Sequence, residues 1–176
     1  MQDPYILQMT ASEPLSLKEE VSMMYDWYED VGKLTFIITD RTTRNETSDL
    51  AGMAGDINIF FNDMDDKNTV EIDVMVAEHK HRRKGLASQA VLTMMRVVRE
   101  HLGVQRFRAK IKLHNEPSMR LFRSLGFVEE TRVEVFNEVH LIHVAGSPKS
   151  PPQGNHAVEV VQAQESVPPT SATESK

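Results

Sequence analysis

The stretch from Thr69 to Leu102 limits the possible folds of this chain most strongly, because it joins a strand, a basic turn and a long amphipathic helix. Residues Thr69–Val76 are rich in β-branched apolar side chains, which predicts a strand. A polar, basic loop, Ala77–Lys84, follows, and a helix begins at Gly85. The apolar residues of this helix recur at three- and four-residue spacing, which predicts one buried face: Leu86, Ala90, Val91, Met94, Met95, Val98 and Leu102.

The basic turn predicts an anion site, and a pyrophosphate is the ligand that fits best. Backbone N–H groups and the positive end of the helix dipole meet at such a turn. Each dipole contribution is only about 0.3–1 kcal/mol at an exposed end, so several N–H groups must act together. The turn contains neither G-x-G-x-x-G nor G-x-x-x-x-G-K-[ST]. The basic run His79–Lys84 has a second interpretation, a nuclear localisation or nucleic-acid segment, which the acidic character of the whole chain disfavours.

Two sequence blocks resemble the acetyl-CoA segments of the GNAT superfamily of N-acetyltransferases. The first is the R-x-x-G-x-A turn of Arg82–Ala87, and the second is N-x-x-S-x-x-L-F-x-x-x-G-F, from Asn115 to Phe127. More narrowly, TASEPLSL, TFII, GDINIF, EIDVMVAE and AKI resemble the N-acetyltransferase 9 branch, and the likeness covers Met1 to Val144. The resemblance implies an acetyl-CoA-dependent N-acetyltransferase, an acyltransferase acting on a protein amine.

The pattern of elements predicts an α/β (α+β) fold. The resemblance implies a GNAT-like sheet, mixed and mostly antiparallel, with helices on both faces. It also implies that the strands beginning at Thr69 and Gln105 form a parallel pair that splays apart. A capping box at Ser16 starts a helix whose apolar face should pack on the domain. The other expected elements are strands at Lys33–Thr39, Met53–Phe61 and Gln105–Leu113, a helix from Asn115 to Gly126, and two strands within Phe127–Val144.

The GNAT-like domain is expected over residues 1–145 and is short at its N-terminus. GNAT domains normally begin with a strand and a helix before the helix that starts here at Ser16, so we expect the usual first strand and most of the first helix to be missing. The strand Lys33–Thr39 would then be an exposed sheet edge. Residues 146–176 are rich in Pro, Ser and Thr and predict a disordered tail. The alternative is a docking peptide around HAVEVV.

Composition narrows the class of protein further. The chain has 176 residues, a net charge of −6 and no cysteine, which disfavours binding to nucleic acid or an anionic membrane and excludes a cysteine acyl-enzyme. We expect a cytoplasmic protein, with a nuclear location as the second option. We expect no metal, because His79 and His81 lack a third ligand. The turn Asn62–Asn68 is either a calcium loop or a hairpin tip, and it lacks the Gly and terminal Glu of an EF-hand.

The resemblance implies contacts to acetyl-CoA from three groups of residues. The backbone of the strand end would pair with the pantetheine amides, and one of its N–H groups would polarise the thioester carbonyl. The turn would hold the pyrophosphate, and the second block would contact the pantetheine arm. The groups are Val74, Met75 and Val76; Arg82, Arg83, Lys84, Gly85, Leu86, Ala87 and Ser88; and Asn115, Ser118 and Phe122. Asn115 is also expected to cap a helix, and Phe122 to belong to the core.

The acid–base groups differ from those of many GNAT relatives, which carry a Tyr at the place of Phe122 or a Glu near the place of Lys110. Phenylalanine has no proton to donate. Glu71 is the first candidate base, Asp73 on the same strand face is the second, and His114 is weaker. A purely structural role for Glu71 is the alternative.

This sparse set of groups favours an N-terminal α-amine as the acceptor. An α-amine has a pKa of about 7.7–8.0 and a lysine about 10.4, so a lysine needs about 3.5 kcal/mol more help to become neutral. The expected reaction is direct attack in a ternary complex, and a tubulin-type N-terminus is a family-level candidate for the substrate. The alternative is a non-catalytic short form that binds acetyl-CoA or a protein partner without turnover.

Overall fold

The computed structural model describes residues 2–43, 52–62 and 66–146, together with the backbone of residues 158–162. Helices and strands alternate much as the sequence predicts, and single 3₁₀ turns lie at His79–His81 and Glu134–Phe136. The helices are α1 (Pro4–Thr10), α2 (Leu17–Glu29), α3 (Leu86–Leu102) and α4 (Glu116–Ser124). The strands are β1 (Lys33–Asp40), β2 (Met53–Phe60), β3 (Thr69–Val76), β4 (Arg106–Lys112), β5 (Val128–Val133), β6 (Glu138–Val144) and β7 (Val158–Gln162).

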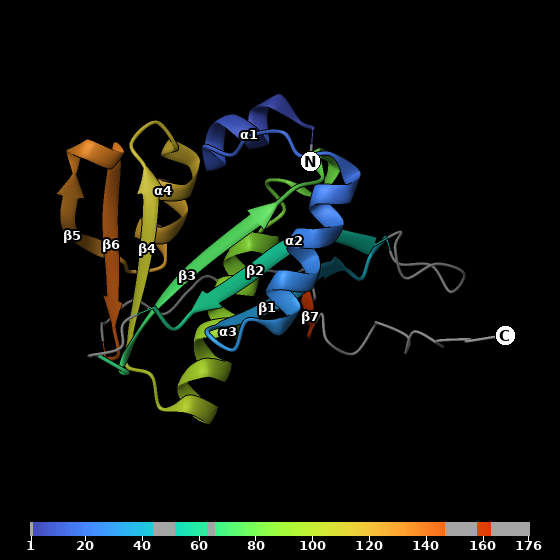
Figure 1. The fold of residues 1–176 in the computed structure, drawn as a ribbon. Coiled ribbons are helices and arrows are strands. Elements are labelled where there is room, and N and C mark those ends of the chain that lie inside the picture. The colour runs from blue at the N-terminus through green and yellow to red at the C-terminus, as the bar shows by residue number, and fades with distance from the viewer. Residues whose placement is uncertain (1, 44–51, 63–65, 147–157, 163–176) are drawn as a thin grey trace, which may run out of the picture.

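The described strands form one sheet in the order β5-β6-β4-β3-β2-β1-β7. Only β3 and β4 run parallel, and every other neighbouring pair is antiparallel. Figure 1 shows α2 in front of the sheet and α3 behind it, so helices lie on both faces. This architecture confirms the predicted mixed, mostly antiparallel fold.

The core lies between the sheet and α3. Six of the seven apolar residues predicted on the buried face of α3 are buried, and Leu102, in its last turn, is 53% exposed. They pack against the sheet, where Ile57, Ile72 and Phe107 are fully buried. Each fully buried side chain of this size stabilises the fold by about 1.5–3 kcal/mol. The core thereby fixes β3, β4 and the start of α3 relative to one another.

Helix α2 differs from its prediction. Its capping box is present, because Ser16 Oγ accepts a hydrogen bond from the Glu19 backbone N–H while the Glu19 carboxylate accepts one from the Ser16 N–H. The expected packed face is not formed, however: no α2 residue is buried, and Tyr25 is 52% exposed. The helix still contacts the sheet at Trp27, whose ring centroid lies 3.3 Å from Lys33 Nζ.

Strand β7 covers part of the edge that the sequence predicted to be exposed. It pairs antiparallel with residues 36–40 of β1. The strand falls within the predicted disordered tail, at the β-branched run VEVV, so this short part of the tail has regular structure. The other residues of the tail beyond Gly146 lie outside the described residues, as does part of the acidic turn considered as a calcium loop.

Candidate active site

The parallel strands β3 and β4 pair over a short length and then separate. Their register covers Thr69↔Arg106, Val70↔Phe107 and Glu71↔Arg108. Beyond this point β3 stays paired with β2 as far as Val76, while β4 stays paired with β6. Residues 72–76 of β3 therefore have no strand partner on their β4 side within the described chain. Such an edge presents backbone N–H and C=O groups that an extended ligand containing amides can pair with.

A glycine in β2 allows this end of β3 to lie where it does. A Cβ atom added to Gly55 would be 1.8 Å from the Met75 carbonyl oxygen. Because the obstacle is backbone, a side chain at position 55 would have to push the strands apart. Gly55 thus fixes the carboxyl end of β3, from which the basic turn departs.

The turn between β3 and α3 has the backbone geometry of an anion site. Arg83 and Gly85 both have positive φ angles, 62° and 80°. Gly85 is the N-cap of α3, and within the described part of the chain no side chain forms a capping hydrogen bond there. Successive N–H groups in such a turn converge on a point in front of the helix, which favours a phosphate group. The predicted residues Lys84, Leu86, Ala87 and Ser88 lie in the same segment, where Leu86 is buried and offers only its backbone.

Arg82, the first residue of the predicted motif, has its donors engaged by the protein. Its Nε donates to the Val76 carbonyl at 3.0 Å, and its Nη2 donates to the Ala77 carbonyl at 2.7 Å and to Asp3 Oδ2 at 3.0 Å. The guanidinium carbon also lies 4.8 Å from the centroid of the Tyr5 ring. Arg82 therefore links the turn to the end of β3 and to the start of α1.

Helix α1, which the sequence did not predict, also reaches the segment after β4. His114 Nε2 lies 2.8 Å from the Gln8 carbonyl oxygen, and Asn115 Nδ2 donates to the Met9 carbonyl at 3.1 Å. Figure 1 shows α1 between the ends of β3 and β4, across the region where they separate. Residues 3–9 thus contact both walls of the site.

The second predicted block has the structural roles expected of it. Asn115 caps α4, because its Oδ1 accepts a hydrogen bond from the Ser118 N–H at 3.2 Å. Phe122 is buried in the core, edge-to-face with Phe127 at 4.9 Å between ring centroids. Both residues lie in α4 or at its start, next to the end of β4, and Ser118 is half-buried in the first turn of the helix.

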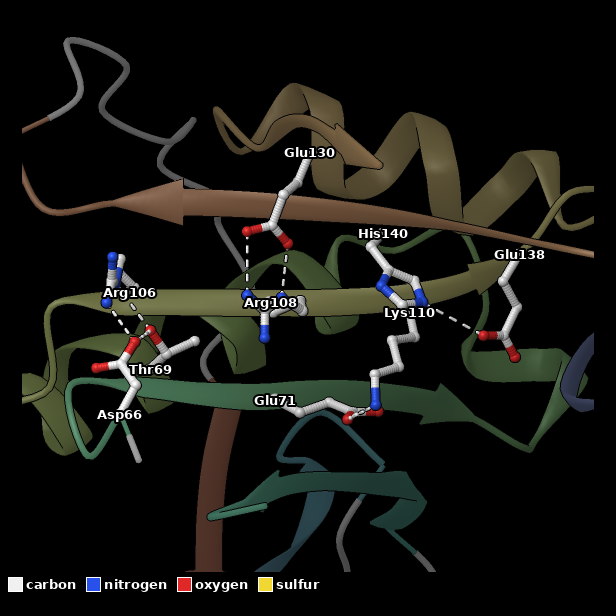
Figure 2. Close-up of polar contacts among 9 residues, drawn as sticks. All are labelled: Asp66, Thr69, Glu71, Arg106, Arg108, Lys110, Glu130, Glu138 and His140. Carbon is white, nitrogen blue, oxygen red and sulfur yellow. Dashed lines mark hydrogen bonds and ion pairs between the residues drawn. The ribbon is translucent and has the colours of Figure 1, made fainter. Parts of the chain in front are cut away.

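Glu71 lies where β3 and β4 part, and it is held by a lysine. Its Oε2 is 2.6 Å from Lys110 Nζ, and it also contacts Asn62 Nδ2 at 3.4 Å. Figure 2 shows that this pair belongs to a row along β4 in which each basic side chain faces an acid. The other members are Arg106 with Asp66, Arg108 with Glu130, and Lys112 with Glu138, which also contacts His140. Glu71, the first candidate base, is therefore one member of a row of ion pairs along β4.

Asp73, the second candidate base, belongs to a different cluster that the sequence interpretation missed. Asn58 in β2 is opposite Asp73, and its Nδ2 donates to Asp73 Oδ1 at 2.8 Å and to Asp56 Oδ2 at 2.7 Å. The amide is oriented by Thr35, whose hydroxyl donates to Asn58 Oδ1 at 2.7 Å. The alternation of GDINIF does put Asp56 and Asn58 on one strand face, which is the signal that could have revealed them.

The electrostatics of this cluster favour proton uptake. Desolvation, helped by the charge of Asp73, raises the pKa of Asp56 to about 6. Desolvation also raises the pKa of Asp73: the residue keeps an exposed surface, but the protein around its carboxyl group displaces part of the water. Lys33 is nearly buried, and desolvation lowers its pKa while Asp73 and Asp56 oppose that change. A carboxylate with a raised pKa is a better base near neutral pH than an ordinary one.

Comparison with known proteins identifies the class to which this fold and site belong. The acetyltransferase (GNAT) domain family matches residues 1–128. The chain is an acetyltransferase and belongs to the GNAT family.

Curated relatives place it more narrowly. It is 46% identical over 143 residues to an N-acetyltransferase 9-like protein of Nematostella vectensis, covering 80% of this chain and 72% of the relative. It is 40% identical over 144 residues to human alpha/beta-tubulin-N-acetyltransferase 9, covering 80% of this chain and 70% of the relative.

Solved structures agree with the fold. Spermidine N-acetyltransferase from Vibrio cholerae, in complex with CoA and spermine, superposes with a TM-score of 0.67 at 17% identity, covering 82% of this chain and 85% of that one. A domain from Methanocaldococcus jannaschii superposes with a TM-score of 0.64 at 21% identity, covering 81% and 85%. At these identities the likeness concerns the fold alone. Among the described helices none is long and apolar enough to span a bilayer.

Proposed function

We propose that this chain transfers an acetyl group from acetyl-CoA to the α-amine at the N-terminus of a protein. The observation that carries the proposal is the unpaired edge of β3 at residues 72–76, which runs from the basic turn to the point where Glu71 and Asp73 lie. The turn suits a diphosphate, the edge suits an amide-containing arm, and carboxylates stand at the far end. The three parts of the site therefore follow one another in the same order as the diphosphate, the amide-containing arm and the thioester of acetyl-CoA.

The cofactor would be held mainly by backbone groups. The backbone of Val74, Met75 and Val76 would pair with the pantetheine amides, except for the Val76 carbonyl, to which Arg82 Nε already donates. One of the N–H groups of these residues would stabilise the negative charge that develops on the thioester oxygen. Residues 83–88 would surround the diphosphate, with Lys84 adding charge, while Arg82 braces the turn from β3. Asn115 and Ser118 would meet the arm from α4, and Phe122 would support that wall from the core.

In the reaction, the neutral amine would attack the thioester carbonyl directly within a ternary complex, and a carboxylate would accept the proton of the amine. The C–S bond would then break, and CoA would leave as a thiolate that takes up a proton from solvent. Of the two predicted carboxylate bases, we favour Asp73, because its carboxylate is held in place by an amide that donates to it. Glu71 is instead held by the ammonium group of Lys110. Asp73→Asn should therefore reduce kcat more than Glu71→Gln does. Equal losses of kcat in the two variants would contradict the preference for Asp73, and a larger loss in the Glu71 variant would identify Glu71 as the base.

The acceptor is proposed from chemistry and from the names of relatives. An α-amine is neutral in about a tenth or more of molecules at pH 7, whereas a lysine is neutral in well under a thousandth. The human relative is named a tubulin N-acetyltransferase, so we propose a tubulin-type N-terminus in the cytoplasm as the substrate. The test is mass spectrometry of two peptides that each contain one internal lysine, one with a free and one with a blocked α-amine. Acetylation of the free α-amine is expected, and acetylation of the lysine in both peptides would refute the proposal.

One observation favours the second candidate, a form that binds acetyl-CoA or a partner without turnover. Asn115 Nδ2, which would otherwise face the pantetheine arm, donates to the Met9 carbonyl, and His114 contacts the Gln8 carbonyl. If α1 keeps these contacts, the diphosphate end of acetyl-CoA can still bind at the turn, but the pantetheine arm should lose its contact with Asn115 and product should fail to form. Calorimetry and turnover measured on the same sample separate the two candidates.

A further inference from the structure

The turn proposed to hold the diphosphate has an unusual backbone, and something must keep it in that shape. Arg83 has a left-handed conformation that non-glycine residues rarely adopt, followed closely by Gly85 in the same region. Such a conformation persists only where its surroundings determine it. Arg82 fixes the β3 side of the turn through the Val76 and Ala77 carbonyls. The residues that fix the other side have no role in the site described so far.

A buried aspartate at the end of β1 is the anchor on that other side. Asp40 is fully buried, and its Oδ2 lies 2.9 Å from His81 Nδ1 and 3.7 Å from Lys84 Nζ. Its Oδ1 accepts hydrogen bonds from Thr42, from the backbone N–H at 2.9 Å and from the hydroxyl at 2.6 Å. Burial alone would raise the pKa of Asp40, but the hydrogen bonds from Thr42 and His81 outweigh it and hold the pKa at about 2. Asp40 is thus a permanently charged group that binds residues on both sides of Arg83.

His81 links this anchor to the turn, and it has a hydrogen-bond partner for only one ring nitrogen among the described residues. The side chain is fully buried, yet its Nε2 has no hydrogen-bond partner among the described residues. An apolar side chain would fill the same space without burying an unpaired nitrogen. The histidine is therefore better explained by what its Nδ1 does, which is to hold Asp40, than by packing.

We propose that Asp40 and His81 are positioning residues for the diphosphate of acetyl-CoA, an inference that rests on the proposed function. Asp40 holds His81, which precedes the left-handed turn, and Lys84, which lies within it. This fixes both the direction of the backbone N–H groups and the reach of the Lys84 ammonium group. Neither residue touches the reacting atoms. Loss of either should weaken recognition of the diphosphate end of the cofactor and leave the chemistry of acetyl transfer intact.

The test compares acetyl-CoA with acetyl-pantetheine, which carries the same thioester but no diphosphate. In Asp40→Asn the ratio of kcat/KM for acetyl-CoA to that for acetyl-pantetheine should fall about ten-fold, as expected for losing a charge-assisted contact. Asp66→Asn is the matched control, since Asp66 pairs with Arg106 at the start of β3, away from the turn. A general loss of stability would lower both activities and leave the ratio unchanged, which would overturn the proposal.

A second pair of variants decides the matter if Asp40→Asn does not fold. In His81→Asn the amide nitrogen takes the place of Nδ1 and can still donate to Asp40, whereas in His81→Gln it reaches the place of Nε2. Calorimetry should show near-normal acetyl-CoA affinity for His81→Asn and weakened affinity for His81→Gln. Equal affinities in the two variants would refute the role of His81. Failure of the unaltered chain to bind acetyl-CoA would instead refute the proposed function itself.

Discussion

Replacing Asp56 by asparagine should stabilise the folded protein at pH 8 and have little effect on its stability at pH 3. Asp56 is partly buried, lies close to the charge of Asp73, and shares the amide of Asn58 with it. Asparagine at position 56 keeps an oxygen that can accept the Asn58 hydrogen bond but carries no charge. The substitution therefore removes the unfavourable ionisation while retaining the contact.

The magnitude follows from the pKa of Asp56, which rises from 3.8 to about 6 on folding, first through desolvation and then through Asp73. Because one pKa unit corresponds to about 1.36 kcal/mol, an increase of about 2 in the pKa corresponds to roughly 3 kcal/mol. Water that reaches the partly exposed side chain reduces this, so we expect about 1–3 kcal/mol. The pKa of Asp56 is higher in the folded protein than in the unfolded chain. The unaltered protein therefore keeps its full stability below about pH 4 and loses this amount as the pH rises through about 6.

Chemical denaturation at a series of pH values between 3 and 8 measures this directly. The free energy of unfolding of the Asp56→Asn variant should exceed that of the unaltered protein by an amount that grows between about pH 4 and pH 6 and is constant above that range. Asp66→Asn is a control of opposite sign, because a hydrogen bond from Thr69 lowers the pKa of Asp66, so this variant should lose stability at neutral pH. A difference for Asp56→Asn that does not change with pH would show that the charge of Asp56 is not destabilising, and the electrostatic account of the cluster would fail.

Three further substitutions test other parts of the site. Gly55→Ala should lower the free energy of unfolding by about 3 kcal/mol or more, because its Cβ would lie 1.8 Å from the Met75 carbonyl oxygen; wild-type stability by denaturation would contradict the close approach of β2 and β3. Phe122→Ala should cost about 3–5 kcal/mol as a core cavity, and a melting temperature close to that of the unaltered protein would show that Phe122 is not core. Gly85→Ala should cost only about 1–2 kcal/mol in stability, because the position has a positive φ but the nearest side-chain atom, of Gln89, is 3.8 Å away. The affinity of this variant for acetyl-CoA, measured by calorimetry, should fall well beyond what that stability loss explains. Unchanged affinity would argue against the turn as the anion site.

The sequence predicted the elements around the site well, because each carries a local signal. The β-branched run of β3, the apolar spacing of α3 and the capping box before α2 all depend on residues close together in the chain. The ends of these elements are as expected to within a few residues. The parallel pair that separates was inferred from resemblance, and the register of β3 with β4 confirms it.

The contacts that give the candidate site its chemistry were less accessible, because they depend on strand register and tertiary packing. Nothing local indicates that Lys110 meets Glu71, or that Asn58 stands opposite Asp73. The contact between Asp40 and His81 likewise joins residues of β1 and of the turn after β3. Packing also overturned one local prediction, since the apolar residues of α2 are partly exposed.

Hydrogen exchange of the backbone amides with and without acetyl-CoA tests directly whether the cofactor binds between β3 and β4. Saturating acetyl-CoA should slow exchange in residues 72–76 and 83–88, the unpaired edge of β3 and the turn that leads into α3. Peptides from β5, the edge strand separated from β4 by β6, should exchange at the same rate with and without the ligand. Protection confined to other segments, or no protection by a folded sample at saturating acetyl-CoA, would show that the cofactor does not bind between β3 and β4.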